Sequence, residues 1–211
     1  GRGPKIGPDG KCYVIVHYHL YRVDDGGMNR VMKGDNGICF DPAGKVYCGG
    51  GYPDRSGESA LHIADIQSGT VTEIPYGTEP IDQIALAGPG RLLLASIVDE
   101  RYVGRYPNAT VTLFSLPEQR KIWSLEISDL KPWRDPILVS VPSEDWALIQ
   151  TGSLLKKISL QDGKNLGVIP NRTQDYVEAR CLTSRKAVYI TRNPVGAYRQ
   201  RGLGMIECYR A

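Results

Sequence analysis

The sequence predicts an all-β protein in which a four-stranded unit is repeated about five times. Three observations lead to this fold class. The chain of 211 residues contains 24 Gly and 14 Pro, a composition typical of many short strands joined by turns. No segment keeps the 3.6-residue apolar period of an amphipathic helix. A turn followed by an apolar strand recurs along the whole sequence, and self-similarity at this spacing indicates a repeat architecture.

The first recurring piece is a tight turn that leads into an apolar strand. Its copies start between about 34 and 54 residues apart. The copies occupy residues 8–14, 42–47, 88–94, 143–148 and 184–189. Pro and Gly preset the turn dihedrals, and the apolar or alternating run that follows predicts a buried or half-buried strand.

The second recurring piece is a strand that ends in a hairpin turn. Its copies occupy residues 20–26, 61–69, 111–116, 154–163 and, truncated, 205–209. The Asp-Gly or Ser-Gly pairs after these strands predict a hairpin into a short outer strand, such as residues 70–74. Each unit therefore reads as strand a, turn, strand b, loop, strand c, turn and strand d.

A four-stranded meander with this period is typical of the blades of a β-propeller, although a two-sheet sandwich also has many short strands. We predict one domain over residues 1–211, with blades at about 1–35, 36–77, 78–128, 129–170 and 171–211. The first and last blades are incomplete. Either the two ends interlock to close a five-blade ring, or the chain is an arc of a larger propeller. An arc exposes strand edges that another polypeptide or further residues would cover.

Two segments, residues 41–50 and 64–71, resemble the blade repeats of bacterial β-propellers. In those repeats an Asp-x-x-Gly-x-(Val/Leu)-Tyr-x-Gly strand precedes a Leu-x-x-x-Asp-x-x-(Ser/Thr)-Gly-x-(Val/Ile) hairpin. The resemblance extends over nearly the whole chain, and it implies the architecture only. Propellers of this kind serve as lyases, hydrolases, quinone enzymes, lectins and scaffolds. The Gly-His…Trp-Asp pattern of strict WD40 repeats does not occur.

Composition excludes several classes of function. A net charge of +3 and a pI near 8.6 are too weakly basic to predict nucleic-acid binding. No run of eighteen apolar residues predicts a membrane span. The sequence predicts neither a metal site nor a cofactor. Two glycosylation sequons, at Asn108 and Asn171, leave the compartment unknown, with a secreted or periplasmic location slightly favoured.

The five cysteines lack the CxxC spacing of a zinc knuckle, and their odd number does not form a complete disulfide framework. Cys39 and Cys48 flank one predicted hairpin turn and could lie opposite each other. The alternative is that both are buried thiols that pack as small apolar side chains.

The candidate ligand-binding residues lie in the longer connections. In a propeller, the b–c and d–a connections emerge on one face, and the short a–b and c–d turns, which we interpret as structural, emerge on the other. The first face collects Arg55, Arg101, Arg105, Trp133, Arg134, Arg172, Tyr176, Arg192, Tyr198, Arg199 and Arg201. Arginine binds carboxylate, sulfate or phosphate through two parallel hydrogen bonds, and aromatic rings stack on sugars. This set predicts an anionic or carbohydrate-like ligand; a solvated rim with internal ion pairs is the alternative.

Four residues on the same predicted face could be catalytic. His17 and His19 are two apart in a predicted strand, so their side chains are expected on one side of it. With Tyr102 and Tyr106 and nearby arginines they would suit a polysaccharide lyase, in which arginine neutralises a uronate carboxylate while His or Tyr moves protons. No Gly-x-Ser-x-Gly elbow and no phosphate-binding P-loop occur. The leading hypothesis is a ligand-binding or interaction module. A lyase and a structural subunit completed by another chain are the alternatives.

Overall fold

A computed structural model describes residues 4–50, 59–98, 108–127, 137–151, 154–169, 182–184, 187–192 and 205–210. Within these ranges the regular structure consists of strands, which form five antiparallel sheets. No helix in the described ranges is long and apolar enough to cross a membrane. The prediction of an all-β chain is therefore confirmed.

Strands pair with their neighbours in sequence, so every sheet is a meander. The first sheet comprises β1 (Lys5–Ile6), β2 (Cys12–Val16), β3 (His19–Asp24) and β4 (Gly27–Lys33). The second comprises β5 (Asn36–Phe40), β6 (Lys45–Gly49), β7 (Ser59–Asp65) and β8 (Val71–Gly77). The third comprises β9 (Gln83–Leu86), β10 (Arg91–Val98), β11 (Asn108–Ser115) and β12 (Arg120–Ile127). The fourth comprises β13 (Ile137–Ser140), β14 (Trp146–Thr151), β15 (Leu154–Ser159) and β16 (Asn165–Ile169), and the fifth β17 (Leu182–Ser184), β18 (Ala187–Arg192) and β19 (Met205–Arg210).

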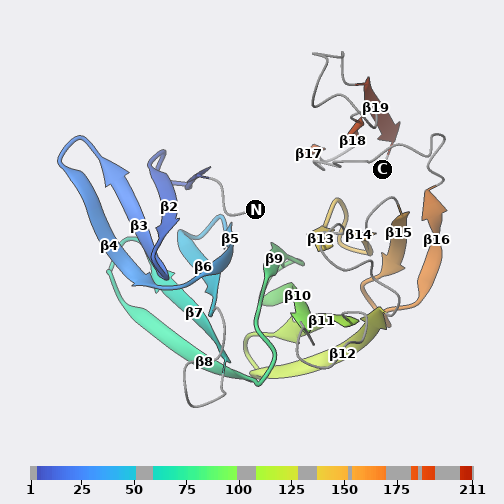
Figure 1. Cartoon of the computed structure of the whole chain (residues 1–211), viewed down its shortest axis with the longest axis horizontal. Coiled ribbons are helices and arrows are strands. Elements are labelled where there is room, and N and C mark those ends of the chain that lie inside the picture. Colours follow the sequence, from blue (N-terminus) through green and yellow to red (C-terminus); the bar gives the residue numbers. More distant parts are fainter. Residues whose placement is uncertain are drawn as a thin grey trace.

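The sheets follow one another in an arc around a common centre (Figure 1). The first strands of successive sheets lie innermost and touch, β5 against β9 and β9 against β13. The last strands, β8, β12 and β16, lie on the outside (Figure 1). This arrangement of separate four-stranded meanders is that of β-propeller blades, as the repeat predicts.

Three apolar clusters lie between neighbouring sheets and hold the blades together. The cluster between the first and second sheets contains Tyr13 and Leu20 from one side and Ile38 and Val46 from the other. Similar clusters join the second sheet to the third and the third to the fourth. The second and third sheets are each covered on both faces, so their inner strands are buried on both sides.

Of the two interpretations of Cys39 and Cys48, the facing pair is wrong, and the thiols instead pack as small apolar side chains against the clusters between sheets. The register pairs Cys39 with Tyr47 and Cys48 with Ile38. Neighbouring residues along a strand point to opposite faces of the sheet, so the two thiols do not face each other, and both are free. Burial raises the pKa of each thiol to about 12, so both stay protonated and unreactive near neutral pH.

A carboxylate–tyrosine pair recurs at the a–b turns of the first two sheets. Asp9 accepts hydrogen bonds from the hydroxyl of Tyr13 at 2.9 Å and from a backbone N–H at 3.1 Å. Asp41 likewise accepts from the hydroxyl of Tyr47 and from a backbone N–H, both at 2.8 Å. Both rings are buried in the clusters between sheets. The aspartates therefore tie the turns to the core.

These pairs predict a loss of stability in alkaline solution. Burial, followed by the hydrogen bond to Asp9, raises the pKa of Tyr13 to about 12, and burial and Asp41 raise that of Tyr47 further. The folded state therefore binds these protons more tightly than the unfolded chain, where tyrosine has a pKa of about 10. The stabilisation is complete below pH 10 and is lost as the pH rises through 12 and beyond.

Urea unfolding midpoints measured at a series of pH values test this expectation. We expect the midpoint to fall between about pH 10 and 12. In a variant with both Tyr13→Phe and Tyr47→Phe, the midpoint should fall less steeply with pH. This variant lacks the two tyrosine hydroxyls but keeps every other group that titrates in this range. Equal slopes for the two proteins would contradict the assignment.

Ring closure stays a prediction. Among the described strands, those of the first and fifth sheets pair only within their own sheets. Closure within the chain, a larger ring and completion by another polypeptide all agree with this pairing.

Candidate functional site

One face of the propeller carries the connections from strand b to strand c and from each sheet to the next. Hydrogen bonds place these connections side by side. The N–H of Gly34, in the link to the second sheet, donates to the carbonyl of Tyr18 in the β2–β3 turn at 3.0 Å. At the next link, the side-chain amide of Asn36 donates to the carboxylate of Asp82 at 3.4 Å. We call this the long-connection face, and the opposite one the short-turn face.

His17 and Tyr18 form a two-residue hairpin turn on the long-connection face. Their φ angles are 46° and 65°, the left-handed values of a type I′ turn, which favours Asn and Gly. For other residues this conformation costs about 1 kcal/mol or more each. The Tyr18 side chain is 64% exposed. This strained turn, which presents an aromatic ring to solvent, is therefore a candidate functional feature.

The turn corrects the prediction that His17 and His19 share one side of a strand. β2 ends before His17 and β3 begins at His19, so the chain reverses between them. The imidazole Nδ1 of His19 instead lies 2.9 Å from the carbonyl oxygen of His17. The two rings therefore belong to the tip and the base of one turn.

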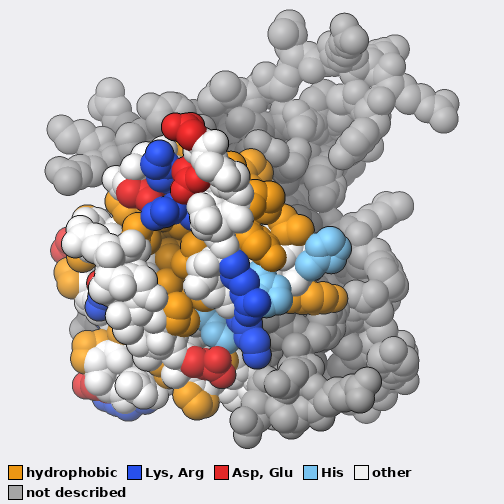
Figure 2. Space-filling view, turned by 90° about the vertical axis from the view of Figure 1, so that its left-hand side faces the viewer, with side chains coloured by type: hydrophobic (Ala, Val, Ile, Leu, Met, Phe, Trp, Pro, Cys, Tyr) orange, Lys and Arg blue, Asp and Glu red, His pale blue; other side chains and the backbone are white. Residues whose placement is uncertain are grey.

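His62, from β7, joins these histidines on the same side of the molecule. His19 pairs across the sheet with Lys33, and the charge of Lys33 also acts on His62. Figure 2 shows the three histidine side chains of the protein along one face, beside a cationic side chain. Residues distant in sequence thus form one surface across the first two sheets.

The protonation of His62 is controlled by its surroundings. Burial lowers its pKa, the carboxylate of Glu73 opposes this effect, and Lys33 adds to it. The Nδ1 atom of His62 lies 3.4 Å from a carboxylate oxygen of Glu73. His62 is therefore neutral at pH 7, and Lys33 supplies the positive charge of this surface.

Most predicted ligand-binding residues lie outside the described residues. These are Arg55, Arg101, Arg105, Trp133, Arg134, Arg172, Tyr176, Tyr198, Arg199 and Arg201, together with the catalytic candidates Tyr102 and Tyr106. Arg192 is the last residue of β18. The strand ends that flank these segments are all of the b–c or d–a kind. Among the predicted residues that the structure describes, it brings together His17 and His19 only.

The described residues contain no group of three His, Cys, Asp or Glu side chains that could hold a metal ion. The lyase hypothesis required the histidines to meet Tyr102 or Tyr106, and this stays a prediction. The surface that is described has aromatic, imidazole and ammonium groups. It can bind a ligand through stacking and charge.

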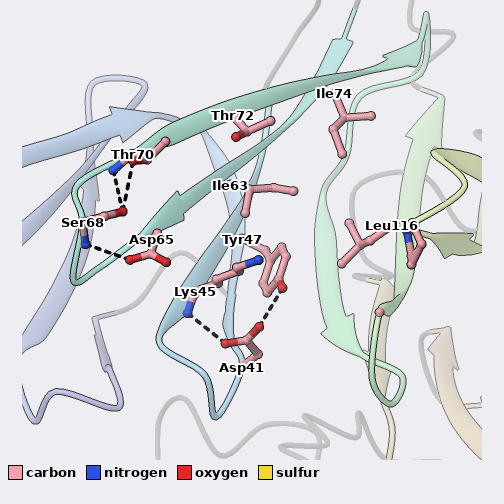
Figure 3. Close-up of a pocket in the computed structure, with 12 residues that line it drawn as sticks. Asp41, Lys45, Tyr47, Ile63, Asp65, Ser68, Thr70, Thr72, Ile74 and Leu116 are labelled. Atoms are coloured by element: carbon pink, nitrogen blue, oxygen red, sulfur yellow. Dashed lines mark hydrogen bonds between the residues drawn. The ribbon is translucent and has the colours of Figure 1, made fainter.

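A second site, on the short-turn face, was missed by the sequence analysis. A cavity of about 640 Å³ lies between the second and third sheets. It is lined by Asp41, Lys45, Tyr47, Ile63, Asp65, Ser68, Thr70, Thr72, Ile74, Gly90, Leu116 and Pro117. We call it the inter-blade groove (Figure 3). The sequence carried no distinct signal for it, because the position of Asp65 is occupied by Asp24 in the first sheet and by serine in the third and fourth.

No protein-family model matches the sequence, and no curated protein matches it. Among solved structures, a chain of the mitotic checkpoint complex is similar, with a TM-score of 0.62 and 11% identity over 89% of this chain and 56% of that one. An acylaminoacyl peptidase has a TM-score of 0.62 and 11% identity over 98% of this chain and 35% of its own. A Bacteroides caccae protein of unknown function has a TM-score of 0.66 and 12% identity over 99% and 77%.

The chain thus spans about half of the checkpoint chain and about a third of the peptidase chain. At 11–12% identity these likenesses show the fold alone. Together with the separate four-stranded meanders, they show that this chain has the β-propeller fold.

Proposed function

We propose that the chain is a binding module whose long-connection face recognises an anionic or carbohydrate-like ligand. The observation that carries the proposal is the strained His17–Tyr18 turn, which presents an exposed ring close to His19 and Lys33. An aromatic ring beside an ammonium group suits a sugar that carries a carboxylate or sulfate. A rigid scaffold that holds such groups on its connections is the usual design of a binding surface.

The sequence of the neighbouring connections supports the same ligand class. The segments that join β6 to β7, β10 to β11 and β12 to β13 contain Arg55, Arg101, Arg105 and Arg134. Because the strand ends on either side open onto the long-connection face, these segments start and end there. Arginine prefers planar oxyanions, to which it donates two parallel hydrogen bonds.

The first experiment replaces the strained turn by its favoured sequence. A variant with His17→Asn and Tyr18→Gly should unfold at higher urea concentration, with a gain of about 1 kcal/mol. It should also bind a heparin oligosaccharide and an oligogalacturonate several-fold more weakly, as measured by isothermal titration calorimetry. A purely structural turn would gain stability without losing affinity, and this result would contradict the proposal.

Charge is tested in the same titrations by a matched pair of variants. Lys33→Gln removes a charge from the long-connection face, and Lys11→Gln removes one from the a–b turn of the same sheet, on the opposite face. We expect Lys33→Gln, and also Arg105→Ala and Arg199→Ala, to weaken binding by up to about tenfold, with a smaller effect at high salt. Equal effects of Lys33→Gln and Lys11→Gln, or no binding of either oligosaccharide, would refute the proposal that the long-connection face binds an anionic ligand.

A further inference from the structure

The inter-blade groove combines an apolar interior with a charged entrance. Its interior is formed by Ile63, Ile74 and Leu116, with the ring of Tyr47 beside them (Figure 3). Ile63 and Leu116 are only partly buried and pack against the cluster between the second and third sheets. Apolar surface therefore continues from the core into a cavity that is large enough for several side chains.

Two carboxylates, those of Asp41 and Asp65, stand at the groove. Asp65 accepts backbone hydrogen bonds from Ser68 at 2.8 Å and Gln67 at 2.9 Å, both at Oδ1. The bond from Ser68 is the main reason that the pKa of Asp65 is lowered. Its other oxygen is turned toward the middle of the groove (Figure 3). Asp41 keeps acceptor capacity as well, because each carboxylate oxygen can accept two hydrogen bonds.

The charge of Asp65 is not needed by the turn that it stabilises. In the fourth sheet Ser159 occupies the equivalent position, and its hydroxyl accepts from the backbone N–H groups of Gln161 and Asp162 at 3.2 and 3.4 Å. In both turns the glycine N–H closes onto the carbonyl of this residue at 2.9 Å. A hydroxyl group therefore also supports this kind of turn, so the charge of Asp65 can be removed by Asp65→Ser while the turn is kept.

Charge identifies the kind of occupant. Lys45 offsets one of the two carboxylates, so the entrance carries a net negative charge in a protein whose total charge is +3. A neutral apolar molecule would form no ion pair with the carboxylates. A sugar could bind the polar groups of the groove but would leave Ile63, Ile74 and Leu116 without an apolar side chain to cover them. An occupant that matches both parts must bring an apolar group and a cation together.

We propose that the inter-blade groove binds an extended peptide segment of a partner protein, in which a large apolar side chain lies next to Arg or Lys. The apolar side chain covers Ile63, Ile74 and Leu116, and the cation pairs with Asp65 and Asp41. This site lies on the short-turn face and takes a basic ligand. It is therefore independent of the anion-binding function proposed for the long-connection face.

Short peptides with Leu and Arg separated by no, one or two glycines are suitable probes. Methyl-labelled protein would be titrated with each peptide, and NMR shifts would be followed at Ile63, Ile74 and Leu116. We expect at least one peptide to shift all three methyl signals, with Kd in the micromolar to millimolar range. Peptides in which Arg is replaced by Glu or Leu by Ser should bind at least several-fold more weakly.

Asp65→Ser copies the turn of the fourth sheet and is the decisive variant. It should keep the fold, as judged by an unchanged urea midpoint within experimental error, and weaken binding of the best peptide by about fivefold to tenfold. Asp24→Ser, in the corresponding turn of the first sheet, should leave the affinity unchanged. Thr72→Arg, at an exposed position of the groove wall, should abolish binding.

Three outcomes would overturn the proposal. One is that no peptide shifts the groove methyl signals. Another is that Glu-containing peptides bind as well as Arg-containing ones. The last is that Asp65→Ser and Asp24→Ser weaken binding equally. Each can occur while the heparin and oligogalacturonate titrations succeed, so failure here is distinguishable from failure of the proposed function.

Discussion

Leu93→Ala is expected to lower the free energy of unfolding by about 2–5 kcal/mol, the usual range for removing a fully buried leucine side chain. Leu93 lies in β10 and is 0% exposed. It belongs to the cluster that also contains Ile137, Ile149 and Ile158 of the fourth sheet. The space left by the missing side chain would therefore lie between two blades. It would weaken the contact between them as well as the packing of the third sheet itself.

Urea unfolding followed by circular dichroism measures this loss. The control is Leu166→Ala, because Leu166 undergoes the same chemical change on the outer strand β16, where it is 53% exposed. Its expected effect is within about 0.5 kcal/mol. If the two variants lost similar amounts of stability, the third and fourth sheets would not be packed as described.

Gly49→Ala is expected to lower the free energy of unfolding by about 1–3 kcal/mol, because it forces atoms into a filled space. A Cβ atom at residue 49 would lie 2.8 Å from the Cβ of Ile81 and even closer to the Ile81 carbonyl oxygen. Ile81 is fully buried in the link between the second and third sheets. Backbone meets backbone here, so no rotamer change can relieve the clash.

The matched control is Gly26→Ala in the β3–β4 turn. Its added Cβ would meet only the Asp24 carboxylate oxygen, at an ordinary 3.4 Å, so a change within about 0.5 kcal/mol is expected. Chemical denaturation of both variants separates the general cost of losing a glycine from the cost of the clash. A mild effect at Gly49 would mean that the link can move away from β6.

The buried strands were the most predictable part of this protein. Residues 92–95 read as a continuous apolar run, and the structure buries all of them completely, with Leu93 facing the fourth sheet and Leu92 and Leu94 facing the second. A strand covered on both faces needs apolar side chains at every position, so its sequence reveals its burial directly. The turn signals that separate the strands are equally local.

The candidate site was less predictable, because it depends on how connections lie relative to one another. The alternation argument put His17 and His19 on one side of a strand, but a turn without Gly or Asn gave no local sign of the reversal. His62 lies beside the same surface because the first sheet packs on the second. The inter-blade groove exists only where two sheets diverge, and no single repeat contains it.

The sequence alone determined the repeat, the four-strand meander and the approximate position of most strands, because turn dihedrals and burial patterns are properties of neighbouring residues. Tertiary structure alone decided which side chains meet. It separated Cys39 from Cys48 by one step of register, gathered the histidines on one face, and left Asp41 and Asp65 together beside an apolar groove. The physical reason is that strand register and the packing of sheet on sheet act between residues far apart in the chain.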